Sequence, residues 1–211
     1  MHPNGGMFNI DVLTFGRMCY RIFDELGISP ARSIDDTGKN LVIRKIMDSV
    51  KDELKIIKAG RNQGFVSEVK SMVSELKQYG VKPDGLEEIA GKIEAGDRLK
   101  QKLIDISRIY KAFEEYINGR YTTVEDRPET MLSVMERSGF FKGADVVFDG
   151  FTGFTPVQYR IIEQIMKVAR QVTITVTLPE DEPYNVIYGD EDLFAMSKTM
   201  ISKAVRIAEE C

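Results

Sequence analysis

The sequence predicts an α/β protein in which an all-helical subdomain is inserted between strands of a parallel sheet. Residues 144–178 have the pattern strand, helix, strand, and so compact a unit implies a parallel crossover connection. Residues 33–119 instead follow helical periodicity throughout, with no convincing strand. We therefore predict an α/β domain formed by residues 1–32 and 120–211, with a helical subdomain over 33–119. The α/β patterns on both sides favour insertion over the alternative, an independent helical domain.

The N-terminal region predicts a short strand followed by a helix. Thr14 can cap a helix from Phe15 to Leu26, and Gly27 can end it. Cys19 falls on the apolar stripe of this helix, so we expect it to be a core residue rather than a reactive thiol. The strand before the helix is indicated by closely spaced apolar residues: Phe8, Ile10, Val12 and Leu13.

Apolar spacing predicts a series of helices across the inserted subdomain and one short helix after it. They are a long helix from Leu41 to Ile57, a second from Phe65 to Gly80, a short one after Pro83-Asp84-Gly85, a fourth from Gly96 to Ile117, and a last one opened by Asp126-Arg127-Pro128. Residues 31–120 carry 18 lysines and arginines against 15 acidic residues, while residues 144–211 carry 6 against 11. Neither imbalance is strong enough to predict nucleic-acid binding from charge alone.

Residues 144–178 contain the first candidate site residue. Residues 146–148 form a short apolar run, typical of a parallel strand buried on both faces, and the run ends on Asp149. Residues 155–158, Thr-Pro-Val-Gln, supply a cap, a first-turn proline and a capping-box partner for a helix. The β-branched residues of 172–178 predict the second strand. Open α/β sheets bind their ligands at the carboxyl ends of parallel strands, so Asp149 lies where a ligand is expected.

The C-terminal region predicts a last helix capped by Asp190. An acidic loop precedes it, and within that loop Tyr184 to Tyr188 suggest a short edge strand. Two or three strands make a thin sheet for so many helices. We therefore expect the chain to be a fragment of a longer protein that holds the rest of the sheet.

The composition argues against several kinds of site. His2 is the only histidine, and Cys19 and Cys211 are the only cysteines, so histidine catalysis, a metal site and a disulfide framework are not predicted. No apolar run approaches the length of a membrane span, and the start lacks the features of a signal peptide. We predict a cytoplasmic protein with no membrane partner.

The sequence also lacks the usual nucleotide-binding loops. A P-loop needs glycines, a lysine and a hydroxyl residue after a strand, because these groups cradle phosphates and magnesium. The nearest match is Thr37-Gly38-Lys39-Asn40, which has Ser33 where the first glycine belongs and Asn40 in place of the hydroxyl. It follows no strand, so we interpret it as a helix N-terminus. No G-x-G-x-x-G dinucleotide fingerprint is present.

The stretch from Asp149 to Tyr159 resembles the Walker B region of superfamily 1 helicases of the UvrD and RecB type. Their pattern runs roughly D-E-F-Q-D-T-x-P-x-Q-Y after an apolar strand, and the matching positions here are Asp149, Phe151, Pro156, Gln158 and Tyr159. Gly150 replaces the glutamate that activates water, and Gly153 replaces a second acidic residue. We interpret Asp149 and Gly150 as the remnant of a Walker B site without a catalytic base, and we predict no catalytic residue.

The first strand and helix resemble the motif Ia region of the same helicases, where a Thr-Phe pair at a strand end contacts single-stranded DNA. By this resemblance, Thr14, Phe15 and Arg17 are candidate DNA-binding residues. A hydroxyl and a guanidinium suit phosphate contacts, and an aromatic ring can stack on a base. The alternative is structural, with Thr14 as a cap and Phe15 as a core residue. In these helicases a helical subdomain is inserted between the two motifs, where residues 33–119 lie.

Four stretches together resemble one family, the AddB (RexB-type) subunit of the bacterial AddAB ATP-dependent helicase–nuclease: LTFGRMCYRIFDELG, DDTGKN, YKAFEEYINGRY and FDGFTGFTPVQYRIIEQIM. The resemblance implies a partial RecA-like fold of the P-loop NTPase/helicase type in the N-terminal part of a far longer subunit. It implies DNA and an AddA-type subunit as partners in the repair of double-strand breaks by recombination. It places ATP, magnesium and an iron–sulfur cluster in the parent protein outside this chain, so the chain alone is not expected to be an enzyme.

The degenerate Walker B stretch favours a scaffold for DNA binding and Chi-sequence recognition over a motor. Two alternatives stay open. One is a free-standing α/β regulatory or protein-interaction module without a DNA role. The other is an active nucleotide hydrolase, which requires that a partner supply both the phosphate loop and the catalytic glutamate.

Overall fold

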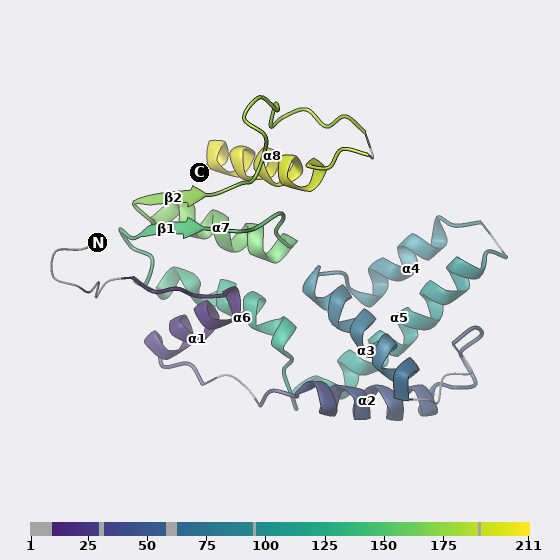
Figure 1. Cartoon of the computed structure of the whole chain (residues 1–211). Coiled ribbons are helices and arrows are strands. Elements are labelled where there is room, and N and C mark those ends of the chain that lie inside the picture. The colour runs from purple at the N-terminus through teal and green to yellow at the C-terminus, as the bar shows by residue number, and fades with distance from the viewer. Residues whose placement is uncertain (1–9, 30–31, 58–62, 95, 190) are drawn as a thin grey trace.

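A computed structural model of the chain describes residues 10–29, 32–57, 63–94, 96–189 and 191–211 (Figure 1). Within these residues the fold is α/β, as predicted, with eight α-helices and a two-stranded parallel sheet. The elements are α1 (Phe15–Glu25), α2 (Asp36–Ser49), α3 (Gln63–Gln78), α4 (Pro83–Gly91), α5 (Arg98–Ile117), η1 (Val124–Asp126), α6 (Arg127–Val134), η2 (Met135–Arg137), β1 (Asp145–Phe148), α7 (Pro156–Val168), β2 (Gln171–Ile174) and α8 (Ala195–Glu210).

The unit β1–α7–β2 confirms the predicted parallel crossover. The two strands pair in parallel from Asp145 opposite Gln171 to Phe148 opposite Ile174. The predicted capping box also forms at the start of α7. Helix α7 has one buried apolar face, because its large aliphatic residues recur at helical spacing: Val157, Ile161, Ile162 and Ile165.

The sheet is more exposed than its apolar sequence predicts. The prediction that 146–148 is buried on both faces is wrong, because the Val147 side chain is 60% exposed while Phe148 is buried. In the described residues, no element covers the face that carries Val147. The second strand is also shorter than predicted. It ends at Ile174 because β1 ends at Phe148, and only the bond from Thr175 N to Phe148 O (2.9 Å) extends the pairing.

Two further strands were predicted and are not seen where the structure describes the chain. Residues 10–13 are irregular, and Phe8 lies outside the described residues. Residues 184–188 form turns and irregular backbone. The predicted cap Asp190 also lies outside the described residues, and Asp192 accepts a hydrogen bond from Phe194 N (2.9 Å) just before α8.

The helix predicted from Leu41 to Ile57 is wrong in its second half, because α2 ends at Ser49. The buried carboxylate of Asp105, on α5, keeps residues 55–57 out of the helix. Its Oδ2 accepts hydrogen bonds from three successive backbone amides, those of Lys55 (3.0 Å), Ile56 (2.7 Å) and Ile57 (3.0 Å). Amides bound to a side chain cannot donate to the carbonyls of a preceding helical turn. Ile57 is nevertheless buried, so the apolar pattern correctly indicated a buried residue but not a helical one.

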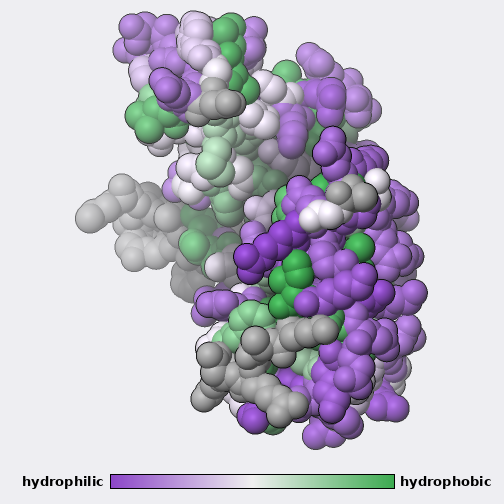
Figure 2. Space-filling view, turned by 90° about the vertical axis from the view of Figure 1, so that its right-hand side faces the viewer, coloured by the Kyte–Doolittle hydropathy of each residue, from purple (hydrophilic) through white to green (hydrophobic). Residues whose placement is uncertain are grey.

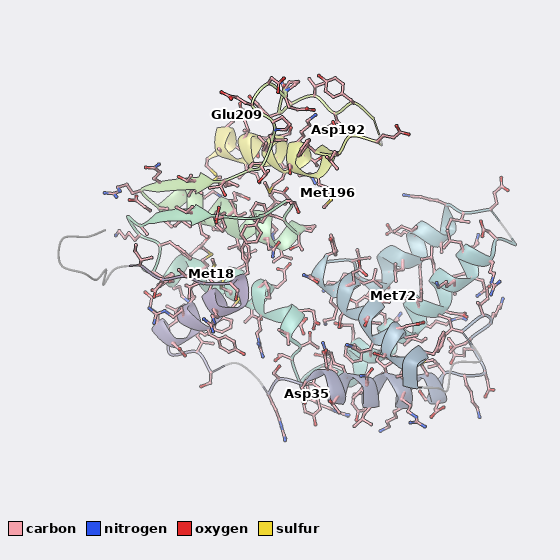
Figure 3. All side chains as sticks on the ribbon, viewed as in Figure 1. Met18, Asp35, Met72, Asp192, Met196 and Glu209 are labelled. Carbon is pink, nitrogen blue, oxygen red and sulfur yellow. The ribbon has the colours of Figure 1, made fainter. Side chains whose placement is uncertain are left out.

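The helices enclose two hydrophobic cores. One draws its residues from Ile34 to Ile117 and lies among α2, α3, α4 and α5. The other combines α1, α6, α7 and the inner face of the sheet. In Figure 3, Met72 marks the first core and Met18 the second. The boundaries of the inserted subdomain, 33–119, remain a prediction.

A buried lysine fixes the first core to the segment that follows it. Lys39 on α2 is 3% exposed, and its Nζ lies 2.8 Å from Glu125 on η1, 2.8 Å from Asp36 and 3.2 Å from Ser74 on α3. Burial disfavours the ammonium, but the hydrogen bonds to Asp36 and Glu125 outweigh it and raise the pKa of Lys39. The stretch that superficially resembled a P-loop is therefore the first turn of α2, as predicted, and its lysine is structural.

We predict that Asp105→Asn lowers the free energy of unfolding by about 2 kcal/mol at neutral pH, because the amide cannot satisfy the amides of residues 55–57 as the carboxylate does. Burial opposes ionisation of Asp105, but its backbone hydrogen bonds outweigh burial and lower the pKa of the carboxyl. A depressed folded-state pKa gives stability at neutral pH that is lost as the pH falls below about 4.

Urea denaturation of both proteins at several pH values measures this difference. The exposed Asp52→Asn is the control, because it removes the same charge without breaking a hydrogen bond in the described part of the chain. Equal stabilities for the two variants at neutral pH would contradict the role given to Asp105.

Candidate functional site at the end of strand β1

Asp149 directly follows β1, as the strand pattern predicts, and its side chain is exposed to solvent. Its Oδ1 accepts a hydrogen bond from the hydroxyl of Thr175, which continues from β2. Across the described residues, no group of three or more His, Cys, Asp or Glu side chains is placed to hold a metal ion. A single carboxylate held by one hydroxyl can accept hydrogen bonds, but it provides neither a metal cage nor a base paired with a nucleophile.

Gly150 has a backbone conformation that disfavours any other residue. Its φ angle is +77°, in the left-handed region that L-residues avoid. A Cβ at this position would meet no heavy atom within 4 Å, so the obstacle is backbone strain rather than space. The chain therefore turns sharply here, and a glutamate at residue 150 would have to be held in a strained backbone.

The loop after β1 is fixed by a cluster of aromatic rings, which we call the aromatic cluster: Phe15, Phe148, Phe151 and Phe154. Phe15 stacks on Phe148 with 5.9 Å between ring centroids and meets Phe151 edge-on at 5.8 Å. Phe154 lies 4.9 Å from Phe151 and 6.2 Å from Phe15. Offset and edge-to-face pairs at these distances are favourable beyond the area they bury. The cluster brings the start of α1 and the end of β1 together.

The three candidate DNA-binding residues occupy different environments at the start of α1. Thr14 caps the helix, because its Oγ1 accepts a hydrogen bond from Arg17 N (3.3 Å). The Phe15 ring is half-buried in the aromatic cluster, and the Arg17 side chain is exposed. Within the described residues, no hydrogen bond or ion pair joins Thr14 or Arg17 to Asp149. The structural alternative thus accounts for the Thr14 hydroxyl and part of the Phe15 ring, and the Arg17 guanidinium is left open to solvent.

The remaining matched residues hold the loop in shape. Gln158 Oε1 accepts from Thr155 N (2.8 Å), and Gln158 N donates to Thr155 Oγ1 (3.3 Å), so the Gln158 side chain serves as a cap. Tyr159 meets Phe154 edge-on at 5.5 Å, and Lys203 Nζ from α8 lies 5.4 Å from its ring centroid. Burial raises the pKa of Tyr159.

Sequence reasoning named Phe15 and Phe151 separately and missed that they touch. The closely spaced phenylalanines Phe148, Phe151 and Phe154 were the available indication, because a strand end followed by a tight loop brings such rings together. A second group that was missed joins α8 to the loop before it. Lys198 on α8 is fully buried, and its Nζ lies 2.7 Å from Asp192 and 2.5 Å from Glu182 of that loop. Met196, labelled with Asp192 in Figure 3, comes from the same helix and lies beside Gly153 of the loop after β1.

Comparison with known proteins gives the family. The family described as "ADDB, N-terminal" matches residues 1–211, which is the whole chain. This chain belongs to the AddB N-terminal family. The resemblance inferred from the sequence motifs is thereby confirmed.

Curated relatives of this AddB N-terminal chain share a third or more of its residues. The relative from Lachnoclostridium phytofermentans is 37% identical over 209 residues, 99% of this chain and 18% of the relative. The one from Acetivibrio thermocellus is 35% identical over 210 residues, 98% of this chain and 18% of the relative. Both are named as a subunit of an ATP-dependent helicase/deoxyribonuclease. The chain spans less than a fifth of the length of these relatives.

The AddB N-terminal helices have no membrane-spanning character where the structure describes them. Each is either too short or too polar to cross a bilayer.

We predict that Gly150→Ala lowers the free energy of unfolding by about 1 kcal/mol, because alanine at φ +77° is strained. Gly85→Ala is the matched control, since Gly85 lies within α4 and an added methyl group would meet nothing there. Alanine favours helices over glycine, so this control is expected to raise stability by up to ~1 kcal/mol. Thermal or urea denaturation measures the change in the free energy of unfolding for each variant. A change in the same direction for both variants would contradict the backbone strain expected at residue 150.

Proposed function

We propose that this chain is the helicase-like N-terminal part of a DNA-processing subunit, and that it contacts single-stranded DNA without hydrolysing ATP. Family membership supports the first statement, because the curated relatives are named as a subunit of an ATP-dependent helicase/deoxyribonuclease. The second statement rests on the residues at the end of β1. By resemblance, the parent complex acts in double-strand break processing and recombinational repair in the cytoplasm, and this subunit contributes to Chi recognition.

One observation carries the DNA-binding proposal: the aromatic cluster joins the two stretches that resemble helicase motifs. Phe15 comes from the stretch like motif Ia, and Phe151 comes from the stretch like Walker B, 136 positions later. Half-buried rings with an exposed arginine two residues beyond Phe15 form a surface that suits a base and its phosphate. Among the described residues no ion pair or side-chain hydrogen bond engages the Arg17 guanidinium, so its charge is available to a ligand.

Gly150 supports the proposal that the chain does not hydrolyse ATP. A water-activating glutamate at this position would have to overcome both the missing side chain and the left-handed backbone. We propose that β1, α7 and β2 are part of a RecA-like sheet whose other strands lie elsewhere in the longer protein. ATP, magnesium and an iron–sulfur cluster would then bind outside this chain, and an AddA-type subunit would be the protein partner.

A second candidate, a protein-interaction module without a DNA role, is favoured by the loop that precedes α8. Several large apolar side chains are exposed there, among them Leu193 at 87% and Tyr188 at 66%. Figure 2 shows hydrophobic residues at the surface near the top of the molecule, above the mostly hydrophilic face of the helical part. Exposed apolar groups of this kind are typical of protein contacts. A DNA-binding measurement separates the two candidates.

We predict that the chain binds a fluorescein-labelled oligothymidylate at low salt, and that Arg17→Ala weakens this binding. Loss of one phosphate contact on a single strand should lower the slope of log affinity against log salt by about 0.7. Fluorescence anisotropy over a salt series measures both quantities.

The matched control for Arg17→Ala is Arg206→Ala, which removes the same charge from the exposed side of α8. Salt-insensitive binding, or equal weakening by both variants, would argue against the Arg17 contact. DNA-stimulated ATP hydrolysis that Asp149→Asn abolishes would refute the idea that the chain is not a motor.

A further inference from the structure

A second surface with cationic and aromatic side chains lies where the chain enters and leaves the helical part. The entering and leaving segments are hydrogen-bonded to each other: Thr122 N donates to Arg32 O (3.0 Å), and Ile34 N donates to Thr122 O (2.9 Å). Figure 1 shows this crossing between α6 and the start of α2, at the lower edge of the molecule. We call the residues around it the junction band: Tyr20, Arg32, Lys45, Tyr116, Arg120, Tyr121 and Arg127.

Tyr116 holds two cations close together. Lys45 Nζ, from α2, lies 5.0 Å from the centre of the Tyr116 ring, and Arg120 Cζ lies 5.3 Å from the same centre. Both cationic residues are exposed. Two like charges on one ring repel each other, and the ring compensates only about 1 kcal/mol for each at an exposed site. Such a pair gains most from a shared anion.

The other cations of the junction band are held in the same way. Arg32 Cζ lies 6.0 Å from the ring centre of Tyr121. Arg127 Cζ lies 4.8 Å from the ring centre of Tyr20, and its Nη2 donates to Ser33 Oγ (3.0 Å). The aromatic contacts fix each guanidinium without neutralising its charge.

No carboxylate in the described residues forms an ion pair with any of these four cations. The contrast with their neighbours is informative. Three lysines on α2 and α3, namely Lys39, Lys70 and Lys77, each pair with at least one carboxylate at 2.5–3.1 Å. The chain as a whole has a formal charge of −4, so acidic residues were available for pairing. The junction band is thus a local concentration of unpaired positive charge on a mildly acidic protein.

We propose that the junction band binds the sugar–phosphate backbone of a single nucleic-acid strand, a contact separate from the aromatic cluster. This inference rests on the proposed DNA-binding function and adds a second contact region to it. Arg32 and Arg120 are exposed, so they keep N–H edges for phosphate oxygens, and guanidinium planes can stack on bases. Arg127 is half-buried and adds charge beside them. Cations repeated among aromatic rings are characteristic of surfaces that bind single strands without sequence preference.

We predict that the double variant Lys45→Ala/Arg120→Ala raises the Kd for the labelled oligothymidylate about tenfold at low salt. The slope of log affinity against log salt should fall by roughly 1.4, since each phosphate contact on a single strand contributes about 0.7. The control is Lys92→Ala/Lys102→Ala, which removes the same charge from exposed positions just after α4 and on α5. Lys102 lies 14 residues before Tyr116 on the same helix, about 21 Å along its axis. Circular dichroism melting verifies that both double variants are folded.

The outcomes separate this inference from the proposed function. If the unaltered chain shows no salt-sensitive binding, the proposed function fails and the junction band fails with it. If the chain binds and Arg17→Ala weakens binding, but the two double variants behave alike, only the junction band is overturned. If polyglutamate of equal charge displaces the oligothymidylate as well as unlabelled DNA does, the surface recognises acidic chains in general, and the nucleic-acid assignment is overturned.

Discussion

The stacking of Phe15 on Phe148 connects the two chain segments that form the α/β part, the one that contains α1 and the one that contains β1. In the described residues no strand precedes α1, so α1 is joined to the sheet by side chains rather than by backbone pairing. The same ring contacts position the loop after β1 and the start of α7. A ring at residue 15 therefore has a structural task whether or not it also meets DNA, because removing it would loosen every element around it.

The loop after β1 is held in shape by capping and ring contacts on either side of its exposed carboxylate. Asp149 is exposed at the strand end, Thr155 and Gln158 cap α7, and Phe151 packs on Phe154. Residue 150 combines the lack of a side chain with a backbone angle that disfavours any residue other than glycine. A resemblance to the Walker B stretch can thus exist without its chemistry, because the matching residues also stabilise the fold.

Local chemistry made part of the structure predictable from sequence. Thr14 caps α1, and Thr155 with Gln158 caps α7, because each motif involves residues only three apart. Asp105 could not be recognised in this way, since the amides that it binds lie about 50 positions earlier. The exposure of Val147 could not be predicted, because a short apolar run fits a strand that is covered on both faces and also one that is covered on a single face. The aromatic cluster and the junction band depend on tertiary contacts between distant segments, which spacing does not reveal.

The crossing at Ser33 and Thr122 has an evolutionary consequence. Because the entering and leaving segments already pair with each other, the ends of everything between them are closed at little further entropic cost. Two ion pairs limit how freely the intervening helices could change, because Lys39 of α2 pairs with Glu125 and Lys77 of α3 pairs with Asp126, both outside those helices. Evolutionary replacement of the helical portion would therefore have to keep these two lysines or supply new partners for both carboxylates.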